Sequence, residues 1–290
     1  MQCMERSVCF LSWGFIIGGV LFLFHQLKVH TQYGRYVDTS APGVMVPAKA
    51  AWFIQELPSV LVPVFLLLST DTSHSLGRSL LVCTFCLHYF QRTFVYSLLN
   101  RGRPCPLFIM VSAVAFCSLN GFLQGHYMLH CAQFDDAWHM DVRFILGAWR
   151  YSGYFYIGGG PAPLIPADVE GRLYFLLFIQ MRLCRLLVFF SGMAINIHSD
   201  RILRNLRKPG EITYKIPEGG MFEWVSGANF FGEIVEWCGY AAATWSLPTF
   251  SFAFFTMCSI GPRAYHHHRY YREKFDNYPK SRKAVIPFLL

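Results

Sequence analysis

The stretch SGANFFGEIVEWCGY, at Ser226–Tyr240, decides the fold class of this chain. It is apolar enough to predict a membrane-spanning helix, yet it carries Asn229, Glu233, Glu236 and Tyr240. Their successive offsets of four, three and four place these side chains on one face of a helix. A carboxylate in hydrocarbon costs roughly 2.5–3.5 kcal/mol on insertion scales. Two carboxylates on one span therefore need a polar partner or a water-filled cavity.

Two interpretations of this polar face stay open. It either holds helices together as a structural stripe or forms part of a buried ligand site. We favour the ligand site, because other apolar segments also carry polar faces: Gln55 with Glu56, Tyr89 with Arg92, Asn120 with Gln124, Asn196 with Asp200, and Arg263 with His267 and Tyr271. In such a site Arg and Lys would bind phosphates, and Asn and acidic groups would bind a ribose or carboxamide. The pattern predicts a large, multiply charged ligand that enters a helix bundle from the cytosol.

Composition assigns the chain to the membrane class. Of its 290 residues, 54% are hydrophobic and 14% are charged, whereas soluble domains have about 25% charged residues. The net charge of +8 does not indicate nucleic-acid binding, because most Lys and Arg lie between apolar runs and at the C-terminus. The ten cysteines lack a regular spacing, so we expect reduced packing residues and no disulfides. Cys83 and Cys86 form a lone CxxC pair, which does not predict zinc.

The apolar runs predict an all-α, seven-span membrane helix bundle that forms one domain over residues 1–290. These runs are Val8–Phe24, Ala50–Leu68, Leu80–Leu99, Leu107–Cys131, Leu173–Ile197, Ser226–Trp245 and Thr249–Tyr271. The first run has no clear small-x-small cleavage site before its polar flank, so we interpret it as a retained span. Basic residues follow the first, third and fifth runs and fill the C-terminal tail, which places the N-terminus outside the cytosol and the C-terminus inside it.

Residues 143–197 do not give one clear pattern. An apolar start, Arg143–Trp149, gives way to a Gly/Pro loop, Tyr151–Glu170, before the run that ends at Ile197. The GGGP in this loop is not a dinucleotide-binding fingerprint, because no βαβ pattern surrounds it. The charge alternation requires one crossing here, formed by the second run, with the first at the surface or turning back. After Asp200 we expect a basic loop, which gathers Arg204, Arg207 and Lys215 around Tyr214.

The triple histidine His266–His268 raises the question of a metal site. Consecutive residues lie about 100° apart on a helix, so at most two of these side chains share a face, and no histidine follows at an offset of four. We therefore expect no metal here and favour contact with a phosphate-bearing ligand. For Tyr89 an ordinary buried tyrosine stays an open alternative, and for Arg204–Lys208 so does a purely topological charge.

Five long strings in the sequence resemble the steroid 5α-reductase family. They are QELPS at Gln55–Ser59, HYFQRTFVYSLLNRGRP at His88–Pro104, INIHSDRILRNLRKPGE at Ile195–Glu211, the stretch at Ser226–Tyr240, and the closing HHHRYYREKFDNYPKSRKAVIPF. The resemblance covers nearly the whole chain. It is closer to the type 2 branch than to the type 1 branch, chiefly through HHHRYY and SLLNRGRP.

The resemblance implies a seven-span enzyme of the endoplasmic reticulum membrane, with a lumenal N-terminus and a cytosolic C-terminus. Such an enzyme uses NADPH to reduce the 4,5 double bond of 3-oxo-Δ4 steroids such as testosterone. The family's ketone-binding pair falls on Glu56 and Tyr89, with further steroid contacts at Trp52, Gln55 and Phe116. Its cofactor contacts fall on Asn196, Asp200, Arg207, Tyr214, Asn229, Glu233, Arg263, His267 and Tyr271. A steroid and the lipid bilayer are the implied partners; no nucleic acid, metal or obligatory protein partner is expected.

The residue types suit this chemistry. Hydride transfer to carbon 5 of an enone moves charge onto the 3-ketone oxygen. A donor held at that oxygen stabilises the enolate by about 3–4 kcal/mol. A buried, protonated Glu56 and the Tyr89 hydroxyl are both able to donate. Carbon 4 then takes a proton, and the sequence does not assign its source. The apolar spans would supply the sterol cavity, and the cofactor carries the redox chemistry.

Two departures from the family pattern stand out. The type 2 pattern has an arginine on the fourth span where this chain reads FIMVSAVAF at Phe108–Phe116, so one cofactor contact is absent. Residues 149–187 have no family counterpart and interrupt the fifth span. Leu173–Leu187 either replaces the first half of that helix, with Arg182 and Arg185 facing the bundle or snorkelling, or the fold is damaged and the chain is inactive. The alternatives are thus an inactive sterol-binding or regulatory membrane protein, or a reductase of another enone such as a polyprenol or enoyl thioester.

Overall fold

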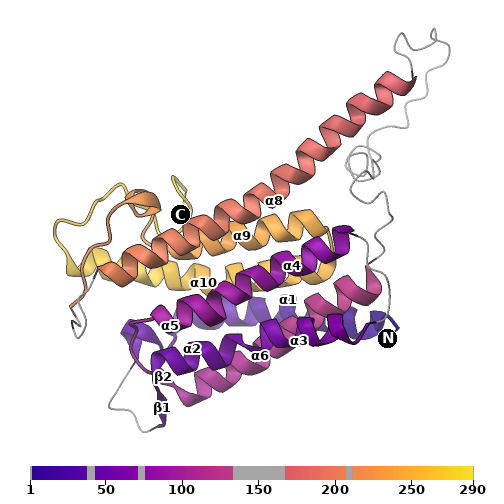
Figure 1. The fold of residues 1–290 in the computed structure, drawn as a ribbon. Helices are drawn as coiled ribbons and strands as arrows, with labels where there is room; N and C mark the ends of the chain where they lie inside the picture. The colour runs from indigo at the N-terminus through magenta and orange to yellow at the C-terminus, as the bar shows by residue number, and fades with distance from the viewer. Residues whose placement is uncertain are drawn as a thin grey trace.

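The computed structural model describes residues 2–37, 43–70, 76–132, 167–206, 211 and 213–289. In these residues long helices lie side by side in a bundle, and a short two-stranded antiparallel sheet lies at one end of it (Figure 1). The elements are α1 (Glu5–Lys28), η1 (Gly34–Tyr36), β1 (Met45–Val46), α2 (Ala48–Glu56), α3 (Pro58–Leu68), α4 (Leu76–Phe90), η2 (Gln91–Tyr96), α5 (Ser97–Leu99), β2 (Cys105–Pro106), α6 (Leu107–His126), η3 (Tyr127–Cys131), α8 (Ala167–Asn205), η5 (Gly220–Glu223), α9 (Ala228–Thr244) and α10 (Leu247–Lys274).

The helical membrane class expected from composition is confirmed. Four helical segments are long and apolar enough to cross a membrane: Glu5–Lys28, Ala48–Leu68, Leu107–Cys131 and Arg185–Asn205. Helices also occupy the other three predicted spans, in α4 with η2 and α5, in α9 and in α10. The outer face of α1 shows how such a helix meets lipid, because Phe10 is 78% exposed and Leu21 is 66% exposed. The count of seven crossings stays a prediction.

Proline interrupts the helix of the second predicted span. Pro58 has no backbone N–H to donate, and α2 ends at Glu56 while α3 begins at Pro58 itself. Glu56 is therefore the last residue of α2, next to the break. The third predicted span has no such break. Its α-helix, α4, continues directly into the π-helical turn η2, which carries Arg92. Such turns are often found at functional sites.

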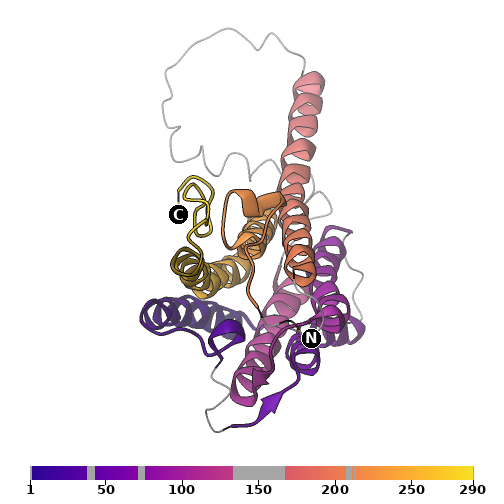
Figure 2. The same cartoon turned by 90° about the vertical axis from the view of Figure 1, so that its left-hand side faces the viewer.

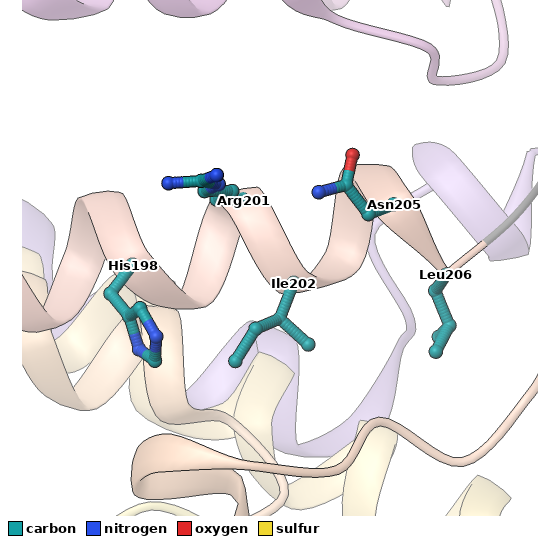
Figure 3. Close-up of a pocket in the computed structure, with 5 residues that line it drawn as sticks. All are labelled: His198, Arg201, Ile202, Asn205 and Leu206. Atoms are coloured by element: carbon teal, nitrogen blue, oxygen red, sulfur yellow. The ribbon is translucent and has the colours of Figure 1, made fainter.

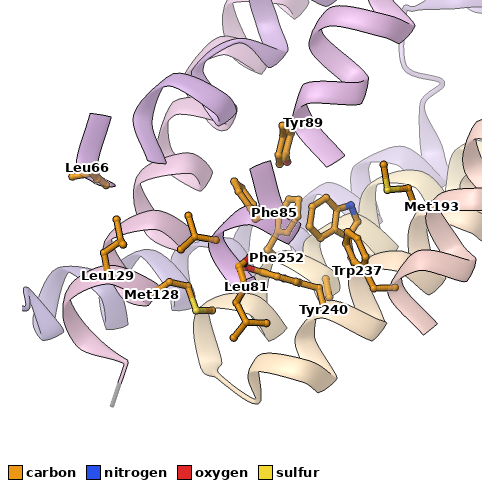
Figure 4. Close-up of a cluster of buried hydrophobic side chains, with 13 residues drawn as sticks. Leu66, Leu81, Phe85, Tyr89, Met128, Leu129, Met193, Trp237, Tyr240 and Phe252 are labelled. Carbon is orange, nitrogen blue, oxygen red and sulfur yellow. The ribbon is translucent and has the colours of Figure 1, made fainter. Parts of the chain in front are cut away.

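A cluster of buried aromatic and aliphatic side chains holds the helices together (Figure 4). Trp237 of α9 lies at its centre, with ring centroids 4.6 Å from Phe252 of α10 and 5.9 Å from Phe85 of α4. The rings are tilted or edge-on, which is the preferred arrangement for aromatic pairs. Tyr89 of α4 belongs to the same cluster. The core thus joins α4, α9 and α10 directly beside one predicted catalytic residue.

The closest helix pair is α8 with α9, and glycine permits it. A Cβ added to Gly192 of α8 would lie 2.2 Å from the backbone nitrogen of Glu236, and one added to Gly232 of α9 would lie 2.5 Å from that of Asn196. Real Cβ atoms do not approach backbone so closely, so any larger residue would push the helices apart. This contact fixes the two helices that carry Asn196, Asp200, Asn229 and Glu233, four of the nine predicted cofactor residues.

The fifth predicted span is longer than expected. The loop predicted to end at Glu170 gives way to helix at Ala167, and the basic segment from Arg201, predicted as loop, stays helical to Asn205. Both ends were predicted wrongly because α8 is a single 39-residue helix. Its first part projects beyond the bundle (Figures 1 and 2). Leu173–Leu187 is continuous with the part that carries Asn196. Arg185 faces the bundle, since its Nη1 donates to the Ala242 carbonyl at 3.2 Å. The predicted segment 143–149 lies outside the described residues.

The expectation that the cysteines are all reduced is wrong. Cys3 and Cys131 form a disulfide across 128 residues of sequence. The spacing of the cysteines does not predict this bond, because the bond depends on the start of α1 lying against η3 in the folded bundle. The Met4 backbone nitrogen also donates to Nε2 of His126 at 3.0 Å, in the same place. Cys83 and Cys86 are free, and within the described ranges no group of three or more His, Cys, Asp or Glu is placed to hold a metal ion.

Candidate active site

A cavity of about 740 Å³ lies between the helices and the loops at one end of the bundle. Its apolar part is formed by α6 and α10, through side chains such as Phe116, Phe252 and Phe255. Its polar part is formed by the loop after α1, the residues that follow α5 and the segment before α9. Among the described lining residues are eight Lys or Arg and four Asp or Glu. One cavity thus offers an apolar wall and a positively charged entrance.

Most of the predicted site residues line this cavity. They are Trp52, Gln55, Glu56, Tyr89, Phe116, Asp200, Tyr214, Asn229, Glu233, Arg263, His267 and Tyr271. Asn196 is not among the lining residues: it is buried, and its Nδ2 donates to the Asn229 carbonyl at 2.9 Å. Arg207 lies outside the described residues. The wall of α6 that lacks the family's arginine presents Ile109, Ala113 and Phe116 to the cavity.

Glu56 and Tyr89 are both held by neighbouring side chains. Gln55 donates through Nε2 to Oε1 of Glu56 at 3.3 Å, and the Cys117 thiol lies 3.8 Å from the other carboxyl oxygen. The Tyr89 hydroxyl oxygen accepts a hydrogen bond from Nδ2 of Asn120 at 3.1 Å. Because Asn120 is the donor in that bond, the Tyr89 hydroxyl keeps its own proton and is able to act as a donor.

The position of Asn120 is itself fixed. Its Oδ1 accepts from Nε2 of Gln124 at 3.2 Å, and the same nitrogen donates to the Pro248 carbonyl at 3.1 Å. Asn120 and Gln124 are essentially fully buried. The polar face predicted on the fourth span therefore supports Tyr89 from behind.

Arg92 gathers carboxylates from two other helices. Its Nη1 lies 2.9 Å from Oδ2 of Asp200, and its Nη2 lies 3.6 Å from Oε2 of Glu233. Its guanidinium also stacks over the rings of Tyr96, at 4.3 Å, and Trp52, at 5.1 Å. The sequence placed Arg92 on a polar face with Tyr89 but gave it no individual role. The structure makes it the link between η2, α8 and α9.

Arg35 occupies an aromatic box that sequence reasoning missed. Its guanidinium lies 4.5–4.8 Å from the ring centroids of Tyr214, Tyr270 and Tyr271, and its Nη2 donates to the Tyr271 hydroxyl at 3.1 Å. No periodic signal could find this group, because Arg35 and Tyr271 are 236 residues apart. The box connects the loop after α1 to the end of α10.

A second tyrosine in that loop also faces the cavity. Tyr33 accepts a hydrogen bond from Nε1 of Trp52 at 2.6 Å. Burial raises the pKa of the Tyr33 hydroxyl well above its ordinary value, so it keeps its proton at physiological pH. Trp52 is thus already engaged through its indole nitrogen, and Tyr33 keeps a proton to donate.

The polar end of the cavity holds donors without a protein acceptor. Nε of Arg263, Nη1 of Arg35 and the Tyr36 hydroxyl are buried and have no hydrogen-bond partner among the described residues. His267 lies between Tyr36 and Phe230, with ring centroids at 5.9 and 5.5 Å. Buried donors of this kind need acceptors, and phosphate oxygens suit guanidinium groups. The residues therefore fit a phosphate-bearing nucleotide cofactor.

A smaller hollow of about 320 Å³ lies further along α8 (Figure 3). His198, Arg201, Ile202, Asn205 and Leu206 line it. None of the predicted catalytic or cofactor-binding residues that the structure describes lines this hollow, so the larger cavity is the candidate active site.

Comparison with known proteins identifies the family. The family model described as 3-oxo-5-alpha-steroid 4-dehydrogenase matches residues 103–158 and 174–290. The chain belongs to the 3-oxo-5-alpha-steroid 4-dehydrogenase family. Within this steroid oxidoreductase family, the unmatched residues 159–173 lie inside the stretch predicted to be an insertion. The boundaries of that insertion stay a prediction.

Curated relatives support the same assignment over the whole chain. The chain is 46% identical over 291 residues to 3-oxo-5-alpha-steroid 4-dehydrogenase 2 of Homo sapiens, covering 100% of this chain and 99% of the relative. It is 45% identical to the type 2 protein of Macaca fascicularis, with the same coverage. It is 40% identical over 288 residues to the type 1 protein of Homo sapiens, covering 98% of this chain and 96% of the relative. These matches include Glu56 and Tyr89, which precede the residues that the family model matches.

Proposed function

We propose that the chain is an NADPH-dependent reductase of the 4,5 double bond of 3-oxo-Δ4 steroids, of the testosterone to 5α-dihydrotestosterone type. One observation carries the proposal: Glu56 and Tyr89 line the same cavity as Arg263 and the Arg35 box. A ketone-binding pair beside an apolar wall and a cationic entrance is the arrangement that a steroid and a dinucleotide together require. The relatives named 3-oxo-5-alpha-steroid 4-dehydrogenase give the substrate class.

The ketone end stabilises developing charge. The Tyr89 hydroxyl accepts a hydrogen bond from Asn120 and keeps its own proton as a donor, and a protonated Glu56 is a second donor. Both donors strengthen as the 3-ketone oxygen gains negative charge, so they stabilise the transition state more than the bound substrate. Gln55 holds the Glu56 carboxyl in place. As a ketone-binding pair, Glu56 and Tyr89 favour a steroid over the polyprenol and enoyl thioester alternatives.

The cofactor end supplies binding and orientation. Bound NADPH supplies the hydride, and the protein holds it. Arg263, His267 and Tyr271 of α10 would contact it with Tyr214, Asn229, Glu233 and Asp200. Asn196 acts through Asn229, whose carbonyl it holds. Arg207 and Lys215 are the proposed partners of the 2′-phosphate; Lys215 pairs with Glu211 at 2.7 Å.

The steroid lies against the apolar wall. Phe116 stacks on Phe255 with centroids 4.7 Å apart, and Phe252 closes the wall toward the aromatic core. These rings form the flat, water-poor surface that a fused-ring substrate needs. Trp52 stands between this wall and the polar end, with its indole N–H already bonded to Tyr33.

We also propose a seven-span topology in the endoplasmic reticulum membrane, with the N-terminus lumenal and the C-terminus cytosolic. Disulfides persist in oxidising compartments such as the endoplasmic reticulum lumen, and the disulfide joins Cys3 to Cys131. The N-terminus lies at the opposite end of the bundle from β1 and β2, near which the basic loops gather (Figure 1). That separation suits a lumenal disulfide and a cytosolic cofactor entrance.

A second candidate is a catalytically inactive sterol-binding member of the family. The interruption of the family match at 159–173 favours it. The two candidates predict different results in one experiment: membranes containing the intact chain are incubated with testosterone and NADPH. Formation of the 5α-dihydro product supports the reductase. An inert intact chain, whose activity appears on deletion of 149–187, supports the inactive variant.

A further inference from the structure

A buried histidine and carboxylate stand directly beside Tyr89 without a role in the chemistry described above. Nδ1 of His88 lies 2.6 Å from Oε1 of Glu236, although the two residues are 148 positions apart. His88 is 3% exposed and Glu236 is 0% exposed. His88 lines the cavity, whereas Glu236 is not among its lining residues. The imidazole therefore separates the carboxylate from the cavity.

The fold holds this pair rigidly. The backbone of Glu236 is pressed against Gly192 of α8, where a Cβ would lie 2.2 Å from the Glu236 nitrogen, and the Glu236 side chain reaches α4. The His88 ring lies edge-on to Trp237 and to Tyr89, at centroid distances of 4.6 and 4.9 Å. The second oxygen of Glu236, Oε2, has no hydrogen-bond partner in the part of the chain that the structure describes.

The chemistry of such a pair is well defined. A carboxylate bound to Nδ1 keeps a proton on that nitrogen and stabilises the imidazolium, so Nε2 is the nitrogen that exchanges a proton with a reactant. The proposed reaction needs one such proton. Once hydride has reached carbon 5, carbon 4 of the enolate must gain a proton before the product forms. Tyr89 and Glu56 are committed to the ketone oxygen.

We propose that His88 donates the proton that carbon 4 takes, and that Glu236 is the residue that positions and charges His88. This inference rests on the proposed steroid reductase function. In the step, the enolate π electrons form the new C4–H bond and the Nε2–H bond breaks, leaving its electrons on nitrogen. The C3=O double bond re-forms, and neutral His88 regains a proton from solvent. The two electrons of the reduction come from the hydride.

The test compares His88→Gln and Glu236→Gln with the wild-type protein in membranes. His126→Gln is the matched control, because His126 is equally buried but lies at the disulfide end, where its Nε2 accepts from the Met4 backbone nitrogen. Loss of a general acid lowers kcat by about 10²- to 10⁴-fold. We expect that loss in His88→Gln with little change in the steroid KM, a smaller loss in Glu236→Gln, and none in His126→Gln.

Isotope effects separate proton donation from a structural clamp between α4 and α9. In His88→Gln the solvent isotope effect on kcat should rise and the effect of deuterated NADPH should shrink, because protonation becomes the slow step. Wild-type kcat and unchanged isotope effects in His88→Gln would overturn the inference. A kcat loss accompanied by equal loss of NADPH binding and of thermal stability, with isotope effects unmoved, would assign the pair a structural role and overturn it too.

Chemical modification decides the matter if both variants fail to fold. Wild-type membranes are treated with diethyl pyrocarbonate, and carbethoxylation at each histidine is followed by mass spectrometry. Loss of turnover in step with modification of His88, with NADPH binding retained, supports the inference; turnover that survives complete modification of His88 overturns it. A wild-type chain that reduces no steroid at all is a distinct result, since it contradicts the proposed function itself.

Discussion

Arg92 and Asp200 form a buried ion pair that fixes the cavity wall between η2 and α8. Their Nη1 and Oδ2 atoms lie 2.9 Å apart, and their side chains are only 10% and 5% exposed. Glu233 of α9 lies on the same guanidinium at 3.6 Å. One cation thus faces two carboxylates, and burying a charge is costly unless it is paired. The polar faces of three helices depend on each other through this residue.

Removing Arg92 should therefore destabilise the protein strongly. Arg92→Met removes the cation that lies 2.9 Å from Asp200, and breaking a buried ion pair by removing one partner costs about 3–5 kcal/mol. We expect a clear fall in the unfolding temperature of the purified protein. The double variant Arg92→Met/Asp200→Asn should recover part of the loss, because one of the stranded charges is gone. A double variant whose loss of stability equals the sum of the losses in Arg92→Met and Asp200→Asn would contradict the coupling.

Tyr89→Phe tests the ketone donor. The change removes one hydroxyl, and loss of one such donor lowers kcat by about 10²- to 10³-fold. NADPH affinity, measured by fluorescence titration, should not change. Tyr240→Phe is the control: this buried tyrosine donates to the Leu81 carbonyl at 3.2 Å and is not among the lining residues described for the cavity. Equal turnover in Tyr89→Phe and Tyr240→Phe would remove Tyr89 from the mechanism.

Asn120→Leu tests whether Tyr89 depends on the network behind it. The substitution removes the donor to the Tyr89 oxygen and leaves one N–H of the Gln124 amide, which donates to Asn120 Oδ1 at 3.2 Å, without its acceptor. An unsatisfied buried polar group costs about 1–3 kcal/mol. We expect lower thermal stability together with a lower kcat. In the Tyr89→Phe background the same change should lower stability but have little further effect on kcat.

The Arg35 box should contribute to cofactor binding. Arg35→Ala removes a guanidinium whose Nη1 has no protein acceptor in the described ranges, and a hydrogen bond to a charged group contributes about 1.5–3 kcal/mol. The Kd for NADPH should rise by at least tenfold, and the effect should weaken as salt is added. Arg269→Ala is the matched control, because Arg269 forms an exposed pair with Glu273. The same Kd in both variants would contradict this role.

Thiol labelling tests the disulfide between Cys3 and Cys131. In protein unfolded by detergent, Cys3 and Cys131 should resist a maleimide reagent until they are reduced, whereas Cys9, which is free, should react without reductant. Replacing Cys3 and Cys131 by serine should lower stability by about 2–4 kcal/mol. Rapid labelling of Cys3 without reductant would contradict the bond.

The sequence predicted the helices well because long apolar runs and their polar faces are local signals. It predicted the face of α9 only in part. Asn229 and Glu233 line the cavity, but Glu236 turns to His88 and Tyr240 bonds to Leu81 in the core. The side chains of this one polar face therefore lie in two different environments, because α9 runs from the polar cavity into the aromatic cluster. Spacing along a helix cannot show where its neighbours change from polar to apolar.

Contacts between distant residues could not be predicted at all. Cys3 meets Cys131 and Arg35 meets Tyr271 because separate helices end at the same place. The bounds of α8 were also misjudged, since an uninterrupted helix can run past both the expected loop and the expected basic turn when propensity allows. The resemblance to known reductases supplied roles for Glu56 and Tyr89 that no pattern in the chain could have given.

The most direct test of the central claim is steroid turnover by the intact chain. Membranes containing the full 290-residue protein are supplied with testosterone and NADPH, and the products are separated by mass spectrometry. We expect 5α-dihydrotestosterone from the wild-type chain and a steep loss of it in Glu56→Gln. An inert wild-type chain that still binds NADPH, or full turnover in Glu56→Gln, would contradict the account.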